Sequence, residues 1–471
     1  MQTVRAFIDG HSVEPAGTYD NIDPADGRVI CSVARSDSAA VDLAVGAARR
    51  AQAGWAATKT ELRADLMHAF AERILGEVDE LAKLETEDTG KPLTQARNDA
   101  IVTARYFKFY GRTIEAYYGE YLPVDEAFHS FSRREPLGVC GSIVAWNYPM
   151  QLFGRAVAPA VVTGNTIVLK PADETPRTAV RLAELASEAG FPAGVINVVP
   201  GIGAEAGQAL GEHPDLDHIG FVGSNPVGRL IAESAAGNVI PATLELGGKS
   251  PHIVFPDADL DTAAEFITKG ILQNAGQTCS AGSRLLVHSA VAEDLYNRLK
   301  TKFEQVSMGP GPGDFDLGPL VSRKQQDRVR AFVEGAEGRI ITGGFAPDEL
   351  SEGSYFSPTL IAGIDPESTI ANEEVFGPVL VTMEFDEEDE AVELANSTDY
   401  ALMAAVWTND IARAHRLSLR VRAGQVYVNA FGAGGGVEYP FGGFKKSGYG
   451  REKGYEALNG YTATKTVIMK L

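Results

Sequence analysis

One cysteine of this chain, Cys279, lies in the stretch NAGQTCSAGSR, where its neighbours are small or polar. A structural cysteine usually has apolar neighbours and is inert, whereas a cysteine in an accessible loop is a candidate nucleophile. Gly276 and Gly282 flank it, and no histidine or second cysteine is nearby. The local sequence therefore leaves two interpretations open: Cys279 is a nucleophile or a bystander.

Two further side chains suit carbonyl chemistry. Glu245, in TLELGGKSP, lies in an apolar strand, where a carboxylate is costly unless it is paired or needed. Desolvation raises a carboxyl pKa, which suits a general base; the alternative is an outward-facing glutamate on a half-exposed strand.

Asn147, in IVAWNYPM, precedes Pro149, which fits the first position of a helix. Its side chain can cap that helix or donate an N–H to a developing oxyanion.

Two segments are candidates for binding a nucleotide. FVGSNPVG follows a strand and opens a helix, so Gly223, Ser224 and free backbone N–H groups can face a pyrophosphate. An ordinary strand-to-helix turn is the alternative. IVLKPADETP places Lys170 at the carboxyl end of a strand and Asp173 three residues later, where they can hold ribose hydroxyls or form a solvated salt bridge. The fingerprint G-x-G-x-x-G is absent.

Composition and charge narrow the class of protein. The formal net charge of −21 argues against nucleic acid or an anionic membrane as a partner. The chain has 3 cysteines that are far apart, which favours a reducing, cytoplasmic compartment. No Cys/His cluster has metal-ligand spacing, so we expect no metal. The start lacks the pattern of a signal peptide, and polar residues and prolines interrupt the most apolar stretch, so we expect no membrane span.

The elements that must position these residues follow an alternating pattern. With 471 residues the chain is too long for one ordinary core, so we expect two large domains. Short apolar runs alternate with helical patterns from residue 138 onward, which predicts parallel sheets with helices on their faces, an α/β fold. Helices are predicted over 38–53, 60–87, 93–115, 150–162, 176–189, 204–212, 226–236, 259–272, 291–305, 322–335, 387–396 and 410–420.

Three segments depart from this alternation. Residues 117–136 alternate aromatic and polar side chains, which indicates extended chain or a hairpin. Residues 460–468 are predicted to form a strand. The glycine-rich tail NAFGAGGGVEYPFGGFKKSGYG (429–450) has few helix or strand formers, so we expect an irregular surface or active-site loop.

Seven motifs together resemble one family. AWNYP, LKPAD, FVGSNPVG, LELGGKSP, NAGQTC, EEVFGP and PFGGFKKSGYGRE occur in an order and at spacings similar to those of the NAD(P)-dependent aldehyde dehydrogenase superfamily, across about residues 5–465. The resemblance implies two Rossmann-like parallel-sheet domains and a small β oligomerisation element. It places the NAD-binding domain at 1–116 and 137–247, the catalytic domain at 248–447 and the oligomerisation element at 117–136 and 458–471. It also implies a homodimer or homotetramer formed by strand exchange.

The resemblance assigns a mechanism to the three candidate catalytic residues. Cys279 matches the nucleophile, which forms a thiohemiacetal with an aldehyde. Asn147 and the backbone N–H of Cys279 would hold the oxyanion. Hydride transfer leaves a thioester, and Glu245 activates the water that hydrolyses it. Acylating relatives, which pass the thioester to coenzyme A, typically lack this glutamate, so its presence favours hydrolysis.

The resemblance also assigns cofactor contacts. Glu374, in EEVFGP, matches the residue that holds the nicotinamide ribose, and Phe376 flanks the ring. A carboxylate at Asp173 accepts ribose hydroxyls and repels a 2′-phosphate, so we expect NAD over NADP. The remaining matches to cofactor-lining positions are Trp146, Lys170, Gly223 and Ser224.

Arg155 is the informative departure from the family. It shares a helix face with Tyr148 and Leu152, at a position where many relatives carry an aromatic residue that lines the substrate tunnel. An arginine there can clamp a substrate carboxylate, assist an aromatic aldehyde, or pair with a carboxylate of the protein. The substrate is therefore expected to be a carboxylated (semialdehyde) or aromatic aldehyde. The glycines of NAFGAGGGVEYP indicate a roomy or mobile substrate mouth.

Two other classes of function stay open from the sequence. A catalytically silent structural protein can keep the fold but usually loses the nucleophile, and Cys279 is present. A cofactor-free thiol esterase can use Cys279 with Glu245, but it has no need of the EEVFGP and GSNPVG elements. Formation of NADH from an aldehyde distinguishes the three classes.

Overall fold

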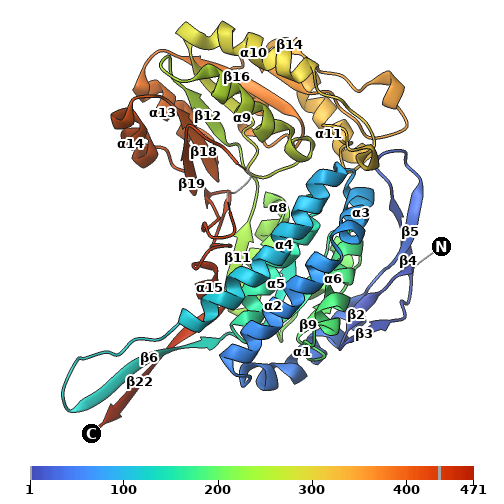
Figure 1. Cartoon of the computed structure of the whole chain (residues 1–471), viewed down its shortest axis with the longest axis vertical. Coiled ribbons are helices and arrows are strands. Elements are labelled where there is room, and N and C mark those ends of the chain that lie inside the picture. The colour runs from blue at the N-terminus through green and yellow to red at the C-terminus, as the bar shows by residue number, and fades with distance from the viewer. Residues whose placement is uncertain (1–2, 433–435) are drawn as a thin grey trace.

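The computed structural model describes residues 3–432 and 436–471. Two α/β units, each built on its own sheet, stack along the long axis, and a two-stranded arm projects from one of them (Figure 1). The predicted α/β fold class with parallel sheets is confirmed. Within the described residues no helix has the length and apolar character needed to cross a bilayer.

The first unit is built on an eight-stranded sheet with the order β21-β11-β10-β7-β8-β9-β2-β3. The five neighbours from β11 to β9 are parallel and almost entirely buried, which is why their sequences run apolar on both faces. The strands are β2 (Ala6–Ile8), β3 (His11–Val13), β7 (Val139–Ile143), β8 (Thr166–Lys170), β9 (Ile196–Val198), β10 (His218–Val222), β11 (Ala242–Glu245) and β21 (Gly448–Tyr449).

Helices cover both faces of this sheet. They are α1 (Ser38–Ala56), α2 (Thr60–Gly76), α3 (Val78–Thr89), α4 (Leu93–Thr113), α5 (Pro149–Val162), α6 (Arg177–Glu188), α7 (Gln208–Gly211) and α8 (Asn225–Asn238). The single helix predicted over 60–87 is wrong, because the backbone leaves helical geometry at Glu77 and divides it into α2 and α3. The helix predicted over 204–212 begins as a π-helical turn (Gly203–Gly207) and ends as the short α7. Gly90 ends α3 in the left-handed conformation at φ 78°.

The second unit is a seven-stranded sheet with the order β14-β15-β16-β13-β12-β18-β19, parallel except for β14. Its strands are β12 (Pro251–Val254), β13 (Arg284–His288), β14 (Arg339–Thr342), β15 (Thr359–Ala362), β16 (Val379–Phe385), β18 (Met403–Trp407) and β19 (Gln425–Val428). Its helices are α9 (Leu260–Leu272), α10 (Ala292–Glu304), α11 (Arg323–Glu334), α12 (Thr369–Asn372), α13 (Glu388–Asn396) and α14 (Ile411–Arg420). β15, a buried four-residue strand, was not predicted.

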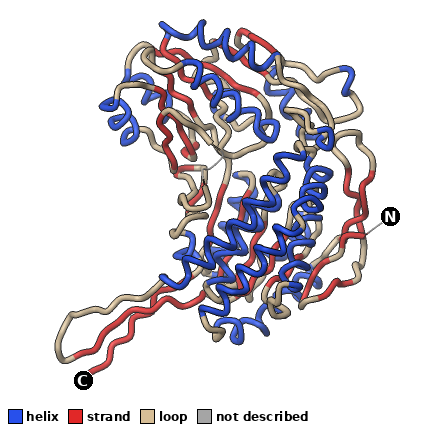
Figure 2. The backbone as a smooth tube through the Cα atoms, in the orientation of Figure 1, coloured by secondary structure: helices blue, strands red, loops and turns tan. Residues whose placement is uncertain are grey.

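The arm pairs two segments that are far apart in the chain. β6 (Phe128–Pro136) and β22 (Thr462–Lys470) form an antiparallel ladder from Thr462↔Pro136 to Lys470↔Phe128. Figure 2 shows this ladder extending away from both units, with the C-terminus at its tip. A separate three-stranded sheet of β1 (Thr3–Val4), β5 (Val29–Ala34) and β4 (Thr18–Ile22) lies on the opposite side of the first unit.

The glycine-rich tail is less irregular than predicted. Within 429–450, β20 (Phe444–Lys445) pairs with β17 (Tyr400–Ala401), and β21 pairs with β11 so that Gly448 lies opposite Glu245. Backbone pairing forms these strands despite the weak local propensity, since β11 offers an open edge. Residues 433–435, in the predicted substrate mouth, lie outside the described residues. The last helix, α15 (Ala457–Gly460), leads into β22.

Candidate active site

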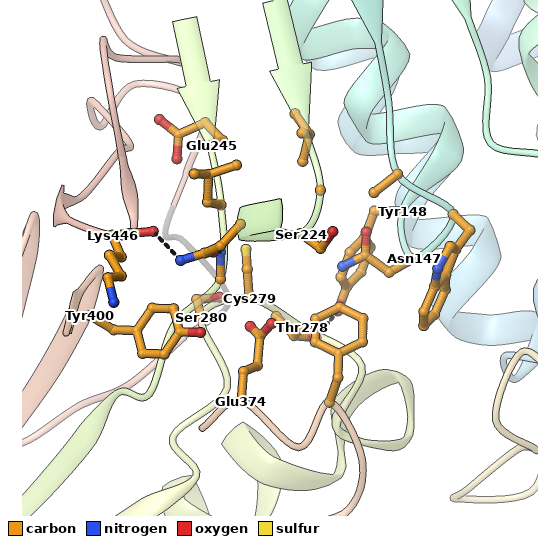
Figure 3. A pocket seen from close by; sticks show the side chains of 18 of the residues that line it. Asn147, Tyr148, Ser224, Glu245, Thr278, Cys279, Ser280, Glu374, Tyr400 and Lys446 are labelled. Atoms are coloured by element: carbon orange, nitrogen blue, oxygen red, sulfur yellow. Dashed lines mark hydrogen bonds between the residues drawn. The ribbon is translucent and has the colours of Figure 1, made fainter. Parts of the chain in front are cut away.

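A cavity of about 1120 Å³ is lined by residues of both units. On the first unit its wall is formed by the residues that follow the carboxyl ends of β7, β10 and β11. Ligands of open α/β sheets bind at this edge. On the second unit the wall includes the loop 278–280 and the segment 367–376, so the cavity joins the two units (Figure 3).

Cys279 lies in the wall of this cavity, in the loop between α9 and β13. The preceding turn is tight, with Asn274 and Ala275 both in the left-handed region at φ 51° and 54°. The other cysteines, Cys31 and Cys140, are buried. Burial raises the pKa of the Cys279 thiol to about 12, against the opposing effect of the Arg155 charge. The resting side chain is therefore a thiol that must lose a proton before it attacks a carbonyl.

Asn147 faces the loop that carries Cys279. Its Nδ2 donates to the carbonyl of Gln277 at 3.0 Å, and its backbone carbonyl accepts from Asn274 Nδ2 at 2.9 Å. The alternative of a helix cap is wrong: Tyr148 is the N-cap residue of α5, and Pro149 takes the first helical position. The side-chain amide instead connects the first unit to the turn before the cysteine.

A buried ionic cluster holds Asn147 from the other side. Lys91 Nζ donates to Glu85 at 2.7 Å, to Asp99 at 2.6 Å and to the Asn147 carbonyl at 3.0 Å. The exposed fractions of the three charged side chains are 0%, 0% and 3%. Glu85 also accepts from the backbone N–H of Met150, in the first turn of α5. The position of Asn147 is thus set by hydrogen bonds from α3 and α4 as well as from the catalytic loop.

Glu245 is the last residue of β11 and is only 2% exposed, so the alternative of an outward-facing glutamate is wrong. Neither carboxylate oxygen has a hydrogen-bond partner within the described part of the chain. Burial raises its pKa well above the usual range, and the nearby Glu452 carboxylate adds to the effect. In Figure 3 the carboxylate is directed away from the Cys279 sulfur, and it lies beside the backbone at Gly442.

The β10–α8 turn forms another part of the wall. Gly223 and Ser224 both line the cavity. Ser224 is the N-cap residue of α8, but its hydroxyl makes no capping hydrogen bond. A side chain at position 223 would collide with the Phe221 ring, because an added Cβ would come within 2.5 Å of it. The turn therefore presents a helix N-terminus and a serine hydroxyl to the cavity.

Glu374 and the aromatic rings of Phe376 and Trp146 form a further part of the cavity wall. Glu374 Oε1 accepts from the backbone N–H of Gly248 at 2.9 Å, and burial raises the pKa of this carboxyl to about 7. Phe376 has a positive φ of 60°, and its ring meets Trp146 edge to face with centroids 5.1 Å apart. Glu374, Phe376 and Trp146, three of the seven predicted cofactor residues, all line the cavity.

Lys170 and Asp173 form an ion pair at the end of β8, but they are not among the residues that line this cavity. The salt bridge of the alternative interpretation is therefore present, with the Lys170 side chain buried and the Asp173 side chain 34% exposed. Asp173 also accepts from the backbone N–H of Gly203 at 3.1 Å. Their contact with a ribose stays a prediction.

Arg155 and Tyr148 also line the cavity, and the part of the wall around them is the predicted substrate side. Arg155 forms an ion pair with Glu452, and its guanidinium lies 4.6 Å from the centroid of the Phe441 ring. The pairing with a protein carboxylate, one of the three roles considered for Arg155, is therefore present. The Tyr148 hydroxyl lies 2.9 Å from Thr278 Oγ1, beside the cysteine.

Comparison with known proteins agrees with this geometry. The model of the Aldehyde dehydrogenase family matches residues 12–467. This chain belongs to the aldehyde dehydrogenase family. It is 42% identical to betaine aldehyde dehydrogenase 1 of Rhizobium meliloti, covering 98% of this chain and 96% of that protein.

Solved structures of the family superpose closely. The NAD-dependent aldehyde dehydrogenase from Sinorhizobium meliloti matches with a TM-score of 0.97 at 39% identity, over 100% of this chain and 95% of the other. The NAD+ complex of the aldehyde dehydrogenase from Bacillus cereus matches with a TM-score of 0.97 at 38% identity, over 100% of this chain and 97% of the other.

Several residues of this aldehyde dehydrogenase site were not found from the sequence. Glu452 and Lys453 follow the glycine-rich tail, and Lys453 lines the cavity beside Arg155. Burial lowers the pKa of Lys453 to about 7, and the Arg155 charge adds to this effect. Lys91 carried one usable signal: it follows Gly90, which ends a helix, and precedes Pro92. Nothing in the sequence pairs Arg155 with a residue almost 300 positions later.

Proposed function

We propose that this protein oxidises an aldehyde to the carboxylic acid with NAD, through a covalent bond between the Cys279 sulfur and the substrate carbon. One observation carries the proposal: Cys279, Asn147 and Glu245 line the same cavity as Gly223, Ser224 and Glu374. A thiol, an amide donor, a buried carboxylate and a dinucleotide cradle are the parts that thiol-based aldehyde oxidation requires.

The first step is attack of the Cys279 sulfur on the carbonyl carbon. Because burial raises the thiol pKa, the proton must pass to a neighbouring base as the carbon–sulfur bond forms. The Asn147 side-chain amide donates to the Gln277 carbonyl, and Lys91 holds the Asn147 backbone carbonyl. The amide would donate to the developing oxyanion together with the backbone N–H of Cys279. The product of this step is a thiohemiacetal.

The other side of the cavity fits NAD. The N-terminus of α8 with the uncapped Ser224 hydroxyl suits a pyrophosphate, and the Glu374 carboxylate suits a ribose hydroxyl pair. Trp146 and Phe376 offer apolar surface for a planar ring. When bound, the nicotinamide supplies the acceptor for the hydride that leaves the thiohemiacetal carbon, and Cys279 then carries a thioester. Asp173, a carboxylate near the predicted adenosine ribose, favours NAD over NADP.

Glu245 completes the cycle. In its ionised form, a carboxylate with a raised pKa is a stronger base, so it can take a proton from the water that attacks the thioester carbon. The carbon–sulfur bond then breaks, which releases the carboxylic acid and returns the proton to the Cys279 sulfur. The Glu245 carboxylate is directed away from the sulfur in Figure 3, so the side chain must turn toward Cys279 in this step. Neither oxygen of Glu245 has a hydrogen-bond partner among the described residues, so no such bond opposes this turn.

We propose a substrate that carries a carboxylate or an aromatic ring. The substrate side of the cavity combines the cations Arg155 and Lys453 with the rings of Tyr106 and Phe441. Arg155 Nε has no hydrogen-bond partner among the described residues, so the guanidinium keeps a donor beyond the Glu452 pair. A carboxylate or an electron-rich oxygen on the substrate would satisfy it.

We also propose that the β6–β22 arm joins copies of this chain in a homodimer or homotetramer. The arm carries exposed apolar side chains, among them Ile468, Met469 and Leu471. β22 pairs on one side with β6 and forms the edge of a two-stranded sheet. An exposed edge of this kind is a template for pairing with a strand of another chain. Sedimentation of the purified protein measures the state directly, and a monomer at micromolar concentration would contradict this proposal.

The test of the activity uses the purified protein, NAD and a panel of aliphatic, aromatic, carboxylated and amino aldehydes. We expect NADH at 340 nm with a subset of the panel, equimolar carboxylic acid, and loss of both in Cys279→Ser. A thiol esterase would hydrolyse p-nitrophenyl esters without any NADH from aldehydes. A catalytically silent protein would show neither reaction, and native-rate oxidation by Cys279→Ser would exclude the covalent mechanism.

A further inference from the structure

The substrate side of the cavity has an unusual distribution of charge. Two cationic side chains, Arg155 and Lys453, line it, and both lie over the same aromatic ring. The Phe441 centroid is 4.6 Å from the Arg155 guanidinium and 5.4 Å from Lys453 Nζ. The carboxylate that pairs with Arg155, on Glu452, is not part of the cavity wall in the described chain. A substrate therefore meets the guanidinium and not its counter-ion.

The remaining acid on this side adds little negative charge. Glu245 lines the cavity, but burial raises its pKa well above the usual range, which favours the uncharged form of this carboxyl, and its side chain is directed away from Cys279. The other acids of the cavity wall, Glu367, Glu373, Glu374 and Asp399, lie in the segments 367–374 and 397–400 of the second unit, where Glu374 accepts from the Gly248 N–H. The groups that a substrate tail contacts near Cys279 are thus positive or neutral.

This arrangement is the opposite of what a cationic substrate needs. Quaternary ammonium groups are recognised by the open faces of aromatic rings. Here cations of the chain itself already contact the Phe441 ring. A cationic tail would have to face the Arg155 guanidinium or displace it. Displacement would leave Glu452, whose side chain is 11% exposed, without its partner. Both outcomes are costly, because like charges repel and a buried unpaired carboxylate is unstable.

We propose that Arg155, held between Glu452 and Phe441, is a charge filter that rejects aldehydes with a quaternary ammonium or other cationic group and admits neutral and anionic ones. The proposal rests on the proposed oxidation at Cys279. It separates this chain from a relative with which it shares 42% of its residues: the protein from Rhizobium meliloti is named for betaine aldehyde, which carries a trimethylammonium group.

The experiment compares two aldehydes of nearly the same shape. Betaine aldehyde and 3,3-dimethylbutanal differ in a positively charged nitrogen against a neutral carbon at the branching centre. We expect the wild-type enzyme with NAD to prefer 3,3-dimethylbutanal in kcat/KM by about 100-fold, since like-charge contacts cost several kcal/mol and each 1.4 kcal/mol is tenfold. The two aldehydes also differ in hydration and electrophilicity, so the decisive quantity is the change of this ratio between variants, in which those differences cancel.

Three variants test the assignment to Arg155. The double variant Arg155→Met/Glu452→Gln removes the cation and its partner together, so that no unpaired charge stays buried. We expect its preference for the neutral aldehyde to fall by about tenfold or more. Arg155→Lys keeps the charge and should keep the preference. Arg298→Met is the matched control: Arg298 is also paired with carboxylates, Asp261 and Asp294, but it lies outside the cavity wall, and its ratio should equal that of the wild type.

Inhibition by the two product acids provides a measurement that needs no variant. Glycine betaine and 3,3-dimethylbutanoate differ in the same way as the aldehydes. We expect 3,3-dimethylbutanoate to inhibit oxidation of 3,3-dimethylbutanal at a Ki about tenfold or more below that of glycine betaine. Equal Ki values, or a wild-type ratio that the double variant leaves unchanged, would overturn the filter. If no aldehyde of either kind gives NADH, the proposed oxidation fails, and the filter fails with it.

Discussion

Two ionic clusters contact the same helix, α5, and they differ in how completely their charges are satisfied. At the first turn of α5, Lys91 donates to Glu85, Asp99 and the Asn147 carbonyl, and all three charged side chains are essentially unexposed. Further along the helix, Arg155 pairs with Glu452 at 11% exposure, and its Nε has no hydrogen-bond partner among the described residues.

The difference assigns the two clusters to different tasks. A buried cluster with every donor used fixes the backbone that it touches, because any movement breaks charge-assisted hydrogen bonds. The Lys91 cluster touches the carbonyl of Asn147 and thereby orients the proposed oxyanion donor. A cluster that keeps a donor toward a cavity can still bind a ligand. Arg155 is such a group. The Lys91 cluster therefore stabilises the structure, whereas Arg155 contributes to the proposed selection of substrates.

Removing the cation of the first cluster should have the largest effect on stability. Lys91→Met leaves Glu85 and Asp99 buried without their partner, and we expect the free energy of unfolding to fall by about 3–5 kcal/mol. Urea denaturation followed by circular dichroism measures it. Lys108→Met is the control, because Lys108 pairs with the exposed Glu72, and such pairs contribute about 1 kcal/mol or less. Equal losses in the two variants would contradict the structural role of the Lys91 cluster.

Removing the carboxylate beside the second cluster should instead affect turnover. For Glu245→Gln we expect the steady-state rate of NADH formation to fall by about 100-fold or more, because hydrolysis of the thioester loses its base. A rapid first turnover should remain and appear as a burst of NADH. Stopped-flow absorbance at 340 nm resolves the burst from the slow phase. A steady-state rate equal to that of the wild type would exclude Glu245 as the base.

The sequence was sufficient for the parts of this site that depend on local pattern. The strand-then-helix alternation placed Asn147 and Ser224 after strands and Glu245 within one, of which it is the last residue, and the small neighbours of Cys279 indicated a loop. These features depend on side chains only a few residues apart, so hydrophobic periodicity and turn-forming residues are enough to predict them.

The contacts that depend on tertiary packing could not be predicted from the sequence. Lys91, Glu85 and Asp99 converge only because the chain bends at Glu77 and Gly90, which packs α3 against α4 and α4 against α5. Arg155 meets Glu452 only because β21 adds to the edge of β11, which weak local propensity at 448–449 did not predict. Long-range pairing overrides such propensity, and a single sequence carries no signal for it.

The buried carboxyl of Glu245 also predicts a pH dependence of stability. Its pKa is raised in the folded state, so the folded protein binds more protons than the unfolded chain above about pH 4.5. The free energy of unfolding of the wild type should therefore decrease as pH rises, by at most about 1.4 kcal/mol per pH unit from this group. Glu245→Gln lacks the group, so its stability advantage over the wild type should grow between about pH 5 and pH 8.

The measurement for this prediction is a set of urea unfolding curves across that pH range. The exposed Glu115→Gln serves as the control and should show no growing difference from the wild type. A constant difference between Glu245→Gln and the wild type at every pH would contradict the raised pKa of the buried carboxyl.

The smallest expected effect comes from Lys453, the second cation of the substrate side. Burial lowers its pKa to about 7, with the Arg155 charge adding to the effect, so Lys453 loses its proton as pH rises through neutrality. The substrate side then carries less positive charge, and an anionic aldehyde should bind less well. Between about pH 6 and pH 8 we expect KM for succinate semialdehyde to rise about threefold relative to that for pentanal.

The ratio of the two KM values cancels the pH dependence of the chemical step, which both substrates share. Lys453→Met should flatten the ratio, because the titrating cation is gone, whereas Lys269→Met, at an exposed lysine paired with Glu265, should leave it as in the wild type. A pH-dependent ratio that persists in Lys453→Met would assign the effect to another group. A flat ratio in the wild type would mean that Arg155 alone supplies the positive charge that substrates meet, which would make the contrast between the two clusters sharper still.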